Sequence, residues 1–375
     1  MKVIGYLFVI ITLFGCYGNK SKSDKDEDTA AKKWLTFEGK ADMPRIVFVS
    51  GDEEYRSEEA LPQLAKILSA KHGFTCTVLF AQDPEKPGII NPNYARNIPG
   101  LENLKTADLM VIFTRFRALP DEQMQHIDDY LKSGKPVIGI RTATHAFNFS
   151  KNDSTSKWKH YGNYYGGEDE WKEGFGRLVL GEKWISHHGN HKHQSTRGVA
   201  APEMDKHPIL NGISPGEIWG STDVYGVRLP LPGDSQPIVL GQVINRTGEY
   251  LENDSLYGMR FTDNDVAAIE IEKDKEGKEV KRNPNDPMMP VAWIKSYQIP
   301  GGQKGKVFTS TIGAATDLLT EGTRRMIINS VFWCLDLSVP EKANVDIVGD
   351  YNPSPYSFKE DQYWLDKNMR VSSQQ

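Results

Sequence analysis

The stretch that best indicates the fold is Met43-Pro44-Arg45-Ile46-Val47-Phe48-Val49-Ser50-Gly51. Its apolar residues run on without the polar alternation of a half-exposed strand, and a glycine ends the run. We therefore predict a parallel strand that is buried on both faces. Three further strands of this kind are predicted at residues 74–80, 107–114 and 135–140.

Helices are predicted between these strands. Residues 57–73 carry leucines at helical spacing after Ser57, which can cap the helix, and Gly73 ends it. Residues 120–134 form a second helix, which begins at a proline and ends at a glycine. The alternation predicts an α/β fold with a doubly wound, mostly parallel sheet. Such a sheet binds ligands at the carboxyl ends of its strands.

The rest of the chain is less regular. Residues 146–220 are rich in Gly, Trp, Tyr and His, and we expect a large loop-rich insertion there. Residues 272–282 are a charged tract that predicts a solvated hairpin tip. The remaining elements are expected to be strands near 236–244, 266–271, 290–294 and 305–311 and a helix near 320–335.

The first sixteen residues have the features of an export signal. A short basic start and the apolar run 3–14 match a signal-peptide core, and the run is too short to span a membrane. It closes at Leu13-Phe14-Gly15-Cys16, which resembles a bacterial lipoprotein box. We expect a lipidated Cys16 that anchors the protein in the cell envelope, at the periplasmic face or the cell surface. An ordinary secretory peptide is the alternative.

This reading divides the chain into four parts. They are a lipoprotein signal peptide (1–16), a polar, disordered tether (17–42), one folded domain (43–337) and a C-terminal tail (338–375) that has few apolar positions and wraps the surface. The net charge is −5 and the pI is near 6.0, so the chain has no basic footprint and nucleic acid is not expected as a partner.

The segment Trp184-Ile185-Ser186-His187-His188-Gly189-Asn190-His191-Lys192-His193-Gln194-Ser195-Thr196-Arg197 indicates a functional site. It holds four of the nine histidines within seven residues. Imidazole is the commonest metal ligand and the side chain that titrates near neutral pH. A solvated loop is the simpler alternative.

The cluster allows two kinds of chemistry. His187 and His191 are four residues apart and could bind a divalent metal such as zinc, with Asp223 as the remote carboxylate. Without a metal, His188 or His191 would act as a general base, and Arg141 or Arg197 would hold an anion or carbonyl.

Two further groups of residues follow predicted strands. Arg141-Thr142-Ala143-Thr144-His145 comes directly after strand 135–140, where a sharp turn presents a side chain to a site. Glu54 and Arg56 follow the first strand and are candidates for catalysis and for substrate binding. Alternatively, residues 52–59 are only a negatively charged helix start. Cys76 and Cys334 lie in apolar contexts, so no catalytic cysteine is assigned.

Over residues 43–337 the sequence resembles the ThuA-like (trehalose utilisation) family, whose fold is that of the class I glutamine amidotransferases. The resemblance rests on Ser50–Glu59, Gly139–Phe147, His187–Gly189, His207–Ile213, Thr222–Gly226 and Val307–Gly313. It implies sugar utilisation, with keto-glycosides made by a partner sugar oxidoreductase as candidate substrates.

The departures from that fold family limit the chemistry. An amidotransferase has a cysteine nucleophile at the elbow, where this chain has Arg141, so we expect no glutaminase activity. A nucleophilic Thr142 or Thr144 beside His145 is an alternative. Residues 313–317 lack the Gly-His that many relatives have near the last strand. The histidine cluster is then the expected source of acid–base or metal chemistry.

The resemblance therefore implies a sugar-processing enzyme, and the histidine cluster would supply the base for an enolisation, epimerisation or hydrolysis. The predicted catalytic and substrate-binding residues are Glu54, Arg141, His145, His188 and His191 for catalysis, and Arg56, Trp184, Ser195, Arg197 and Tyr225 for the substrate. A non-catalytic sugar-binding lipoprotein and a metal-dependent hydrolase of another substrate class are the alternatives.

Overall fold

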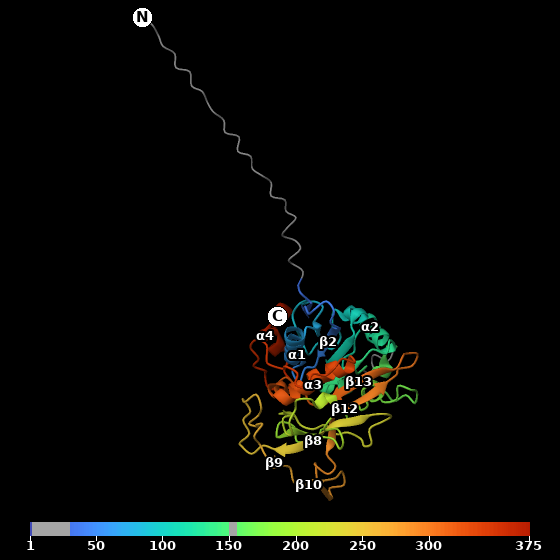
Figure 1. The fold of residues 1–375 in the computed structure, drawn as a ribbon, viewed down its shortest axis with the longest axis vertical. Coiled ribbons are helices and arrows are strands. Elements are labelled where there is room, and N and C mark those ends of the chain that lie inside the picture. Colours follow the sequence, from blue (N-terminus) through green and yellow to red (C-terminus); the bar gives the residue numbers. More distant parts are fainter. Residues whose placement is uncertain (2–30, 150–155) are drawn as a thin grey trace. The chain divides into compact units, whose positions relative to one another are not determined.

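The predicted first strand is β2 (Arg45–Gly51), and it lies inside the parallel part of the sheet (Figure 1). It pairs in parallel with β3 (Thr75–Phe80) on one side and with β4 (Leu109–Thr114) on the other. β5 (Val137–Ile140) and β13 (Gly305–Ser310) continue the parallel part beyond β4. The computed structural model describes Met1 and residues 31–149 and 156–375, of which Lys32–Gln375 form one unit.

Helices cover both faces of this parallel part. Ile46 and Phe48 pack in one apolar core with residues of α1 (Ser57–His72) and α3 (Glu321–Cys334). Val47 and Val49 point the other way, into a second core shared with α2 (Asp121–Lys132). Alternating side chains of one strand thus fill two separate cores, which explains why the run has no polar face.

The sheet is mixed, so the expectation of a mostly parallel sheet is wrong. In the order β1-β3-β2-β4-β5-β13-β12-β8-β6-β7, with β9 beside β8, the five strands β3 to β13 are parallel, and the remaining strands run antiparallel to their neighbours. These remaining strands are β1 (Trp34–Phe37), β6 (Gln194–Ala200), β7 (Trp219–Gly220), β8 (Gln236–Asn245), β9 (Asp265–Val266) and β12 (Met289–Tyr297). A short loop joins β12 to β13, and a parallel pair would need a longer crossover.

The described part of the expected tether, residues 31–42, and the C-terminal tail both contain regular elements. β1 falls within residues 17–42, which were expected to be a tether, and pairs with β3. The C-terminal tail packs on the unit, where it buries Tyr356, Trp364 and Val371 and forms α4 (Asp361–Lys367). These aromatic and aliphatic anchors are spaced too widely for a periodic pattern to reveal them.

Residues 272–282 form most of an exposed hairpin, β10 (Glu270–Lys273) and β11 (Glu279–Arg282), as the charged tract predicts. The predicted signal peptide, Cys16 and most of the tether lie outside the described residues. Within the part that the structure describes, no helix is long and apolar enough to cross a membrane.

Candidate functional site

Residues that follow three parallel strands meet at the carboxyl edge of the sheet. Glu54 comes after β2, Arg115 after β4 and His145 after β5. Together they help to line a pocket of about 130 Å³, whose wall is formed by Glu54, Arg115, Phe116, His145, Trp184, His187, Tyr225 and Phe358. In sheets of this order, ligands bind at this edge, where neighbouring connections leave to opposite faces.

Backbone pairing brings the histidine segment to this edge. The N–H groups of His188 and Gly189 donate to the carbonyl of Val224, at 2.8 and 3.0 Å, and Gly226 N–H donates to Ser186 at 2.9 Å. Gln194 N–H then donates to Asn190, which closes a tight turn. This turn brings His191 back beside His187, with ring centroids 4.8 Å apart.

Asp223 joins these two histidines. Its Oδ2 lies 2.7 Å from Nδ1 of His187 and its Oδ1 lies 3.0 Å from Nδ1 of His191, while the carboxylate itself is fully buried. Burial alone would raise the pKa of Asp223, but the hydrogen bonds from both imidazoles and the charge of Arg141 hold it well below its usual range. An ionised carboxylate only accepts, so each Nδ1 carries a hydrogen in this arrangement.

Arg141 supports Asp223 from behind and does not line the pocket. It sits at the elbow with φ +48° and is fully buried. Its Nη2 donates to Asp223 Oδ1 at 3.1 Å and its Nη1 donates to the carbonyls of Asp223 and Thr311. The rings of Tyr55 and Tyr225 lie 4.3 and 3.9 Å from the guanidinium carbon. The guanidinium therefore fixes a carboxylate and cannot clamp a substrate, contrary to the prediction.

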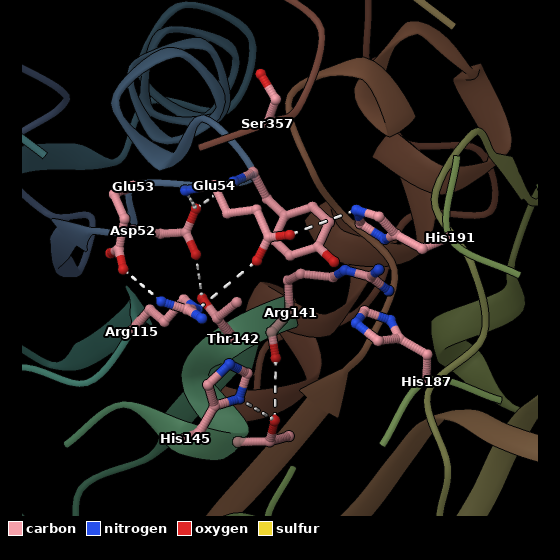
Figure 2. Close-up of polar contacts among 12 residues, drawn as sticks. Asp52, Glu53, Glu54, Arg115, Arg141, Thr142, His145, His187, His191 and Ser357 are labelled. Atoms are coloured by element: carbon pink, nitrogen blue, oxygen red, sulfur yellow. Dashed lines mark hydrogen bonds and ion pairs between the residues drawn. The ribbon is translucent and has the colours of Figure 1, made fainter. Parts of the chain in front are cut away.

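Glu54 is the carboxyl group of the pocket wall. It is 6% exposed, and its Oε1 lies 3.5 Å from Nε2 of His191 (Figure 2). Burial, together with the charge of Asp52, raises the pKa of Glu54 to about 7, although Arg115 opposes the shift. The carboxyl group therefore exchanges its proton near neutral pH, which is the property that a general acid or base requires.

His145, which follows β5, is a further titratable residue of the pocket wall. Burial, with the charges of Arg115 and Arg141, lowers its pKa well below the ordinary value, so the ring is neutral. Its Nδ1 lies 3.2 Å from the hydroxyl of Thr144, and its Nε2 has no hydrogen-bond partner among the described residues. A neutral imidazole with a free nitrogen can accept or pass on a proton.

Thr142 and Thr144, the alternative nucleophiles, are buried and not part of the pocket wall. Thr142 donates to the carboxylate of Asp52 at 2.6 Å (Figure 2). Both hydroxyls therefore hold the elbow in place.

Arg115 was not predicted from the sequence, although it follows a predicted strand directly. It forms an ion pair with Glu53 and lies 3.7 Å from Glu54. Its burial would lower the pKa, but Glu53 and Glu54 outweigh that effect and raise it, so the side chain stays charged. Its position after a predicted strand could have placed Arg115 in the site, because residues at the carboxyl ends of parallel strands share one edge of the sheet.

Two histidines of the cluster lie elsewhere. His188 Nε2 contacts the carbonyl of Pro284 at 2.8 Å, away from Asp223, and burial lowers its pKa. His193 is exposed and stacks on Tyr250. His188 is therefore not part of the site. The two histidines that converge on Asp223 are His187 and His191, which a tight turn of the backbone brings together.

Three predicted substrate-binding residues have structural contacts instead. Arg56 is fully buried and donates to the carbonyls of Glu53, Pro355 and Ser357. Ser195 is buried in β6 and accepts a hydrogen bond from the indole of Trp219. Arg197 donates to Asn264 and to the backbone of residues 261 and 263.

Trp184 and Tyr225, by contrast, do line the pocket, together with Phe116 and Phe358, which were not predicted. Phe116 follows Arg115 directly, so the same edge argument could have found it. Phe358 lies in the tail, and no sequence signal pointed to it.

The arrangement also has the donors of a metal site. One ligand atom from each of His187, His191 and Asp223 lies within 4.8 Å of the others. Two imidazoles and a carboxylate are the set that a catalytic zinc ion commonly takes. If His191 bound a metal through Nδ1, its Nε2–H would face Glu54, and metal-bound histidines usually have such a carboxylate partner.

Fold and site together define an α/β protein with a pocket lined by titratable side chains at the carboxyl edge of its parallel strands. The family model for ThuA, described as trehalose utilisation, matches residues 45–334, so the chain belongs to the ThuA family and the resemblance is confirmed.

Two solved structures are similar to this chain. A ThuA-like protein from Parabacteroides merdae has a TM-score of 0.42 and 13% identity over 86% of this chain and 99% of its own. A ThuA-like protein from Bacteroides uniformis has a TM-score of 0.40 and 12% identity over 79% and 93%. No curated protein matches the chain.

Proposed function

We propose that this ThuA-family protein is an envelope enzyme of carbohydrate utilisation that moves protons on a carbonyl sugar, such as a keto-glycoside supplied by a sugar oxidoreductase. Glu54 carries the proposal. It is a buried carboxyl group in a pocket, its pKa is about 7, and a neutral imidazole lines the same pocket. Such tuned groups are typical of proton-transfer sites.

The proposed step is an enolisation. Ionised Glu54 takes the proton from the carbon next to the sugar's carbonyl group. The electron pair of the broken C–H bond forms a C=C bond with the carbonyl carbon, and the π pair of the carbonyl moves to its oxygen. Arg115, whose charged guanidinium faces the same pocket, stabilises the resulting enediolate. Return of the proton to the other face or to the neighbouring carbon gives an epimer or an isomer, and His145 passes protons between the sugar oxygens.

The residues present also fit a divalent metal. His187, His191 and Asp223 would hold it, and Glu54 would be the hydrogen-bond partner of His191. Such an ion would supply a Lewis acid for the carbonyl oxygen. The assignment of Glu54 as the base is the same with or without the ion.

Proton exchange in D₂O tests the proposal directly. Wild-type protein should introduce deuterium next to the carbonyl of 3-ketoglucose or 3-ketotrehalose, as read by NMR, and the Glu54→Gln variant should be slower by roughly 10²- to 10⁴-fold. His193→Ala, a change at an exposed histidine of the same segment, is the control and should retain the wild-type rate. Sugar binding without exchange would instead favour a non-catalytic sugar-binding protein.

A further inference from the structure

One wall of the pocket comes from outside the part of the chain that the family model covers. The match ends at residue 334, and Phe358 belongs to the C-terminal tail. Its side chain lines the pocket, yet the residue is 55% exposed. A large apolar side chain that stays exposed beside a polar pocket is a candidate for contact with a ligand.

The backbone around Phe358 is held firmly. Tyr356 is fully buried and stacks on Tyr55, with centroids 5.3 Å apart. The carbonyl of Ser357 accepts from Arg56, and that of Lys359 accepts from Asn93 at 2.9 Å. Because its neighbours on both sides are fixed, Phe358 offers its ring in one place at low entropic cost.

Phe358 is part of an aromatic rim around the pocket. The guanidinium of Arg115 lies 4.7 Å from the ring centre of Phe358 and 4.7 Å from that of Phe116. Phe116 in turn stacks on Tyr164, which is 62% exposed, with centroids 5.7 Å apart and planes inclined by 27°. Two separate segments, the loop after β4 and the tail, therefore place aromatic faces at the pocket, and Tyr164 extends the first of them toward the surface.

The size of the pocket suggests what the rim contacts. Its volume of about 130 Å³ is small beside the several hundred Å³ that enclose most ligands of drug size. A pocket of this size is too small to enclose a disaccharide, so part of a glycoside bound there lies outside it. The C–H face of a pyranose is apolar, and burying it against an aromatic ring removes both surfaces from water.

On the basis of the proposed function, we propose that the rim binds the second sugar of a glycoside, stacked on Phe358, so that the tail selects disaccharides over monosaccharides. The test compares kcat/KM for 3-ketotrehalose and 3-ketoglucose. Wild-type protein should prefer the disaccharide. In Phe358→Ala the ratio of the two values should fall by about three- to tenfold, the size of one aromatic contact. Phe358→Trp should keep the preference.

Phe261→Ala is the matched control, because this ring is 46% exposed and does not line the pocket. It should leave the ratio unchanged. An equal loss for both sugars in Phe358→Ala, or no preference in wild-type protein, would overturn the rim proposal while leaving the enzyme proposal intact. If no keto-sugar reacts, the enzyme proposal fails, and calorimetry with trehalose and glucose still decides whether Phe358 contributes to disaccharide binding.

Discussion

The raised pKa of Glu54 suits proton transfer, but burial of the ionised carboxylate reduces the stability of the folded protein. In the folded protein, burial and the nearby charge of Asp52 raise the pKa of Glu54 to about 7, from an ordinary value of 4.5. The folded state therefore binds more protons than the unfolded chain between these values. Stability linked to this group is fully present below about pH 4.5 and is lost as the pH rises through about 7.

We therefore expect Glu54→Gln to stabilise the protein at pH 8 while it reduces activity. The upper limit of the gain is about 3 kcal/mol, because each unit of pKa is worth about 1.4 kcal/mol. Melting temperatures of wild type and variant should differ at pH 8 and converge near pH 4.5. The kcat/KM of wild-type protein should rise as the pH rises through about 7, because only ionised Glu54 accepts a proton. A flat profile would show that another group is the base.

The pair His187 and His191 decides between the metal-bound and the metal-free site. Both Nδ1 atoms carry hydrogens when they contact Asp223, and a metal would replace these hydrogens. We expect zinc to bind with one site per chain and to bind more weakly at pH 5.5 than at pH 8. His187→Ala should weaken binding by at least the roughly 10- to 100-fold that loss of an outer hydrogen-bond partner costs.

Calorimetry with zinc and elemental analysis of untagged protein provide the measurement, and neither depends on turnover. His193→Ala is the control, since this exposed ring lies outside the Asp223 cluster. Equal zinc affinity in the two variants would show adventitious binding to the loop and would leave the metal-free arrangement.

At the scale of elements, Arg56 connects the start of α1 to the tail. It donates to the carbonyls of Pro355 and Ser357, which precede Phe358. Arg56→Met keeps most of the side-chain volume but leaves these acceptors without their donor, at a cost of about 1–3 kcal/mol for each buried group. We expect a lower melting temperature and protease cleavage within residues 350–360.

Limited proteolysis followed by mass spectrometry measures this effect. Arg45→Met, at an exposed position of β2, is the control and should be cut as slowly as wild-type protein. A resistant tail in Arg56→Met would show that the stacked Tyr356 alone is sufficient to hold it.

The sequence was sufficient for elements whose burial is local. The parallel strands and α1 to α3 are visible because apolar residues recur within a few positions. β6 was missed because Gln194–Ala200 is polar; its side chains are satisfied by distant partners, such as Trp219 for Ser195. The convergence of His187 with Asp223 was expected, but backbone pairing with Val224 decides that His188 points away.

In the whole chain, the sequence features of residues 1–16 predict export and lipid attachment of the unit that begins at Lys32. We expect Cys16 to carry the lipid, and the polar residues after it to let the pocket reach sugars outside the membrane. In cells labelled with a fatty acid, wild-type protein should be labelled and sediment with membranes. Cys16→Ala should lose both properties, whereas Cys76→Ala should keep them. A Cys16→Ala protein that stays membrane-bound would contradict lipid anchoring.

The distribution of thiols over the molecule predicts how this ThuA protein differs from a glutaminase. Cys76 in β3 and Cys334 at the end of α3 are buried, and burial raises the pKa of both thiols. The elbow after β5, where an amidotransferase has its nucleophile, holds Arg141, whose guanidinium is committed to Asp223. With no accessible thiolate among the residues that the structure describes, and with Cys16 expected to carry lipid, we expect no thioester with glutamine.

We therefore expect no ammonia from glutamine, and no loss of sugar turnover after treatment with iodoacetamide. Peptide mapping should find Cys76 and Cys334 unmodified in folded protein and alkylated after denaturation. Arg141→Cys is the informative variant, because it places a cysteine at the elbow. The change also removes the ion-pair partner of the buried Asp223 carboxylate. Loss of one member of a buried ion pair costs about 3–5 kcal/mol of folding stability. The variant should unfold at lower temperature and still release no ammonia. Ammonia release by wild-type protein would show that a group other than cysteine attacks the amide.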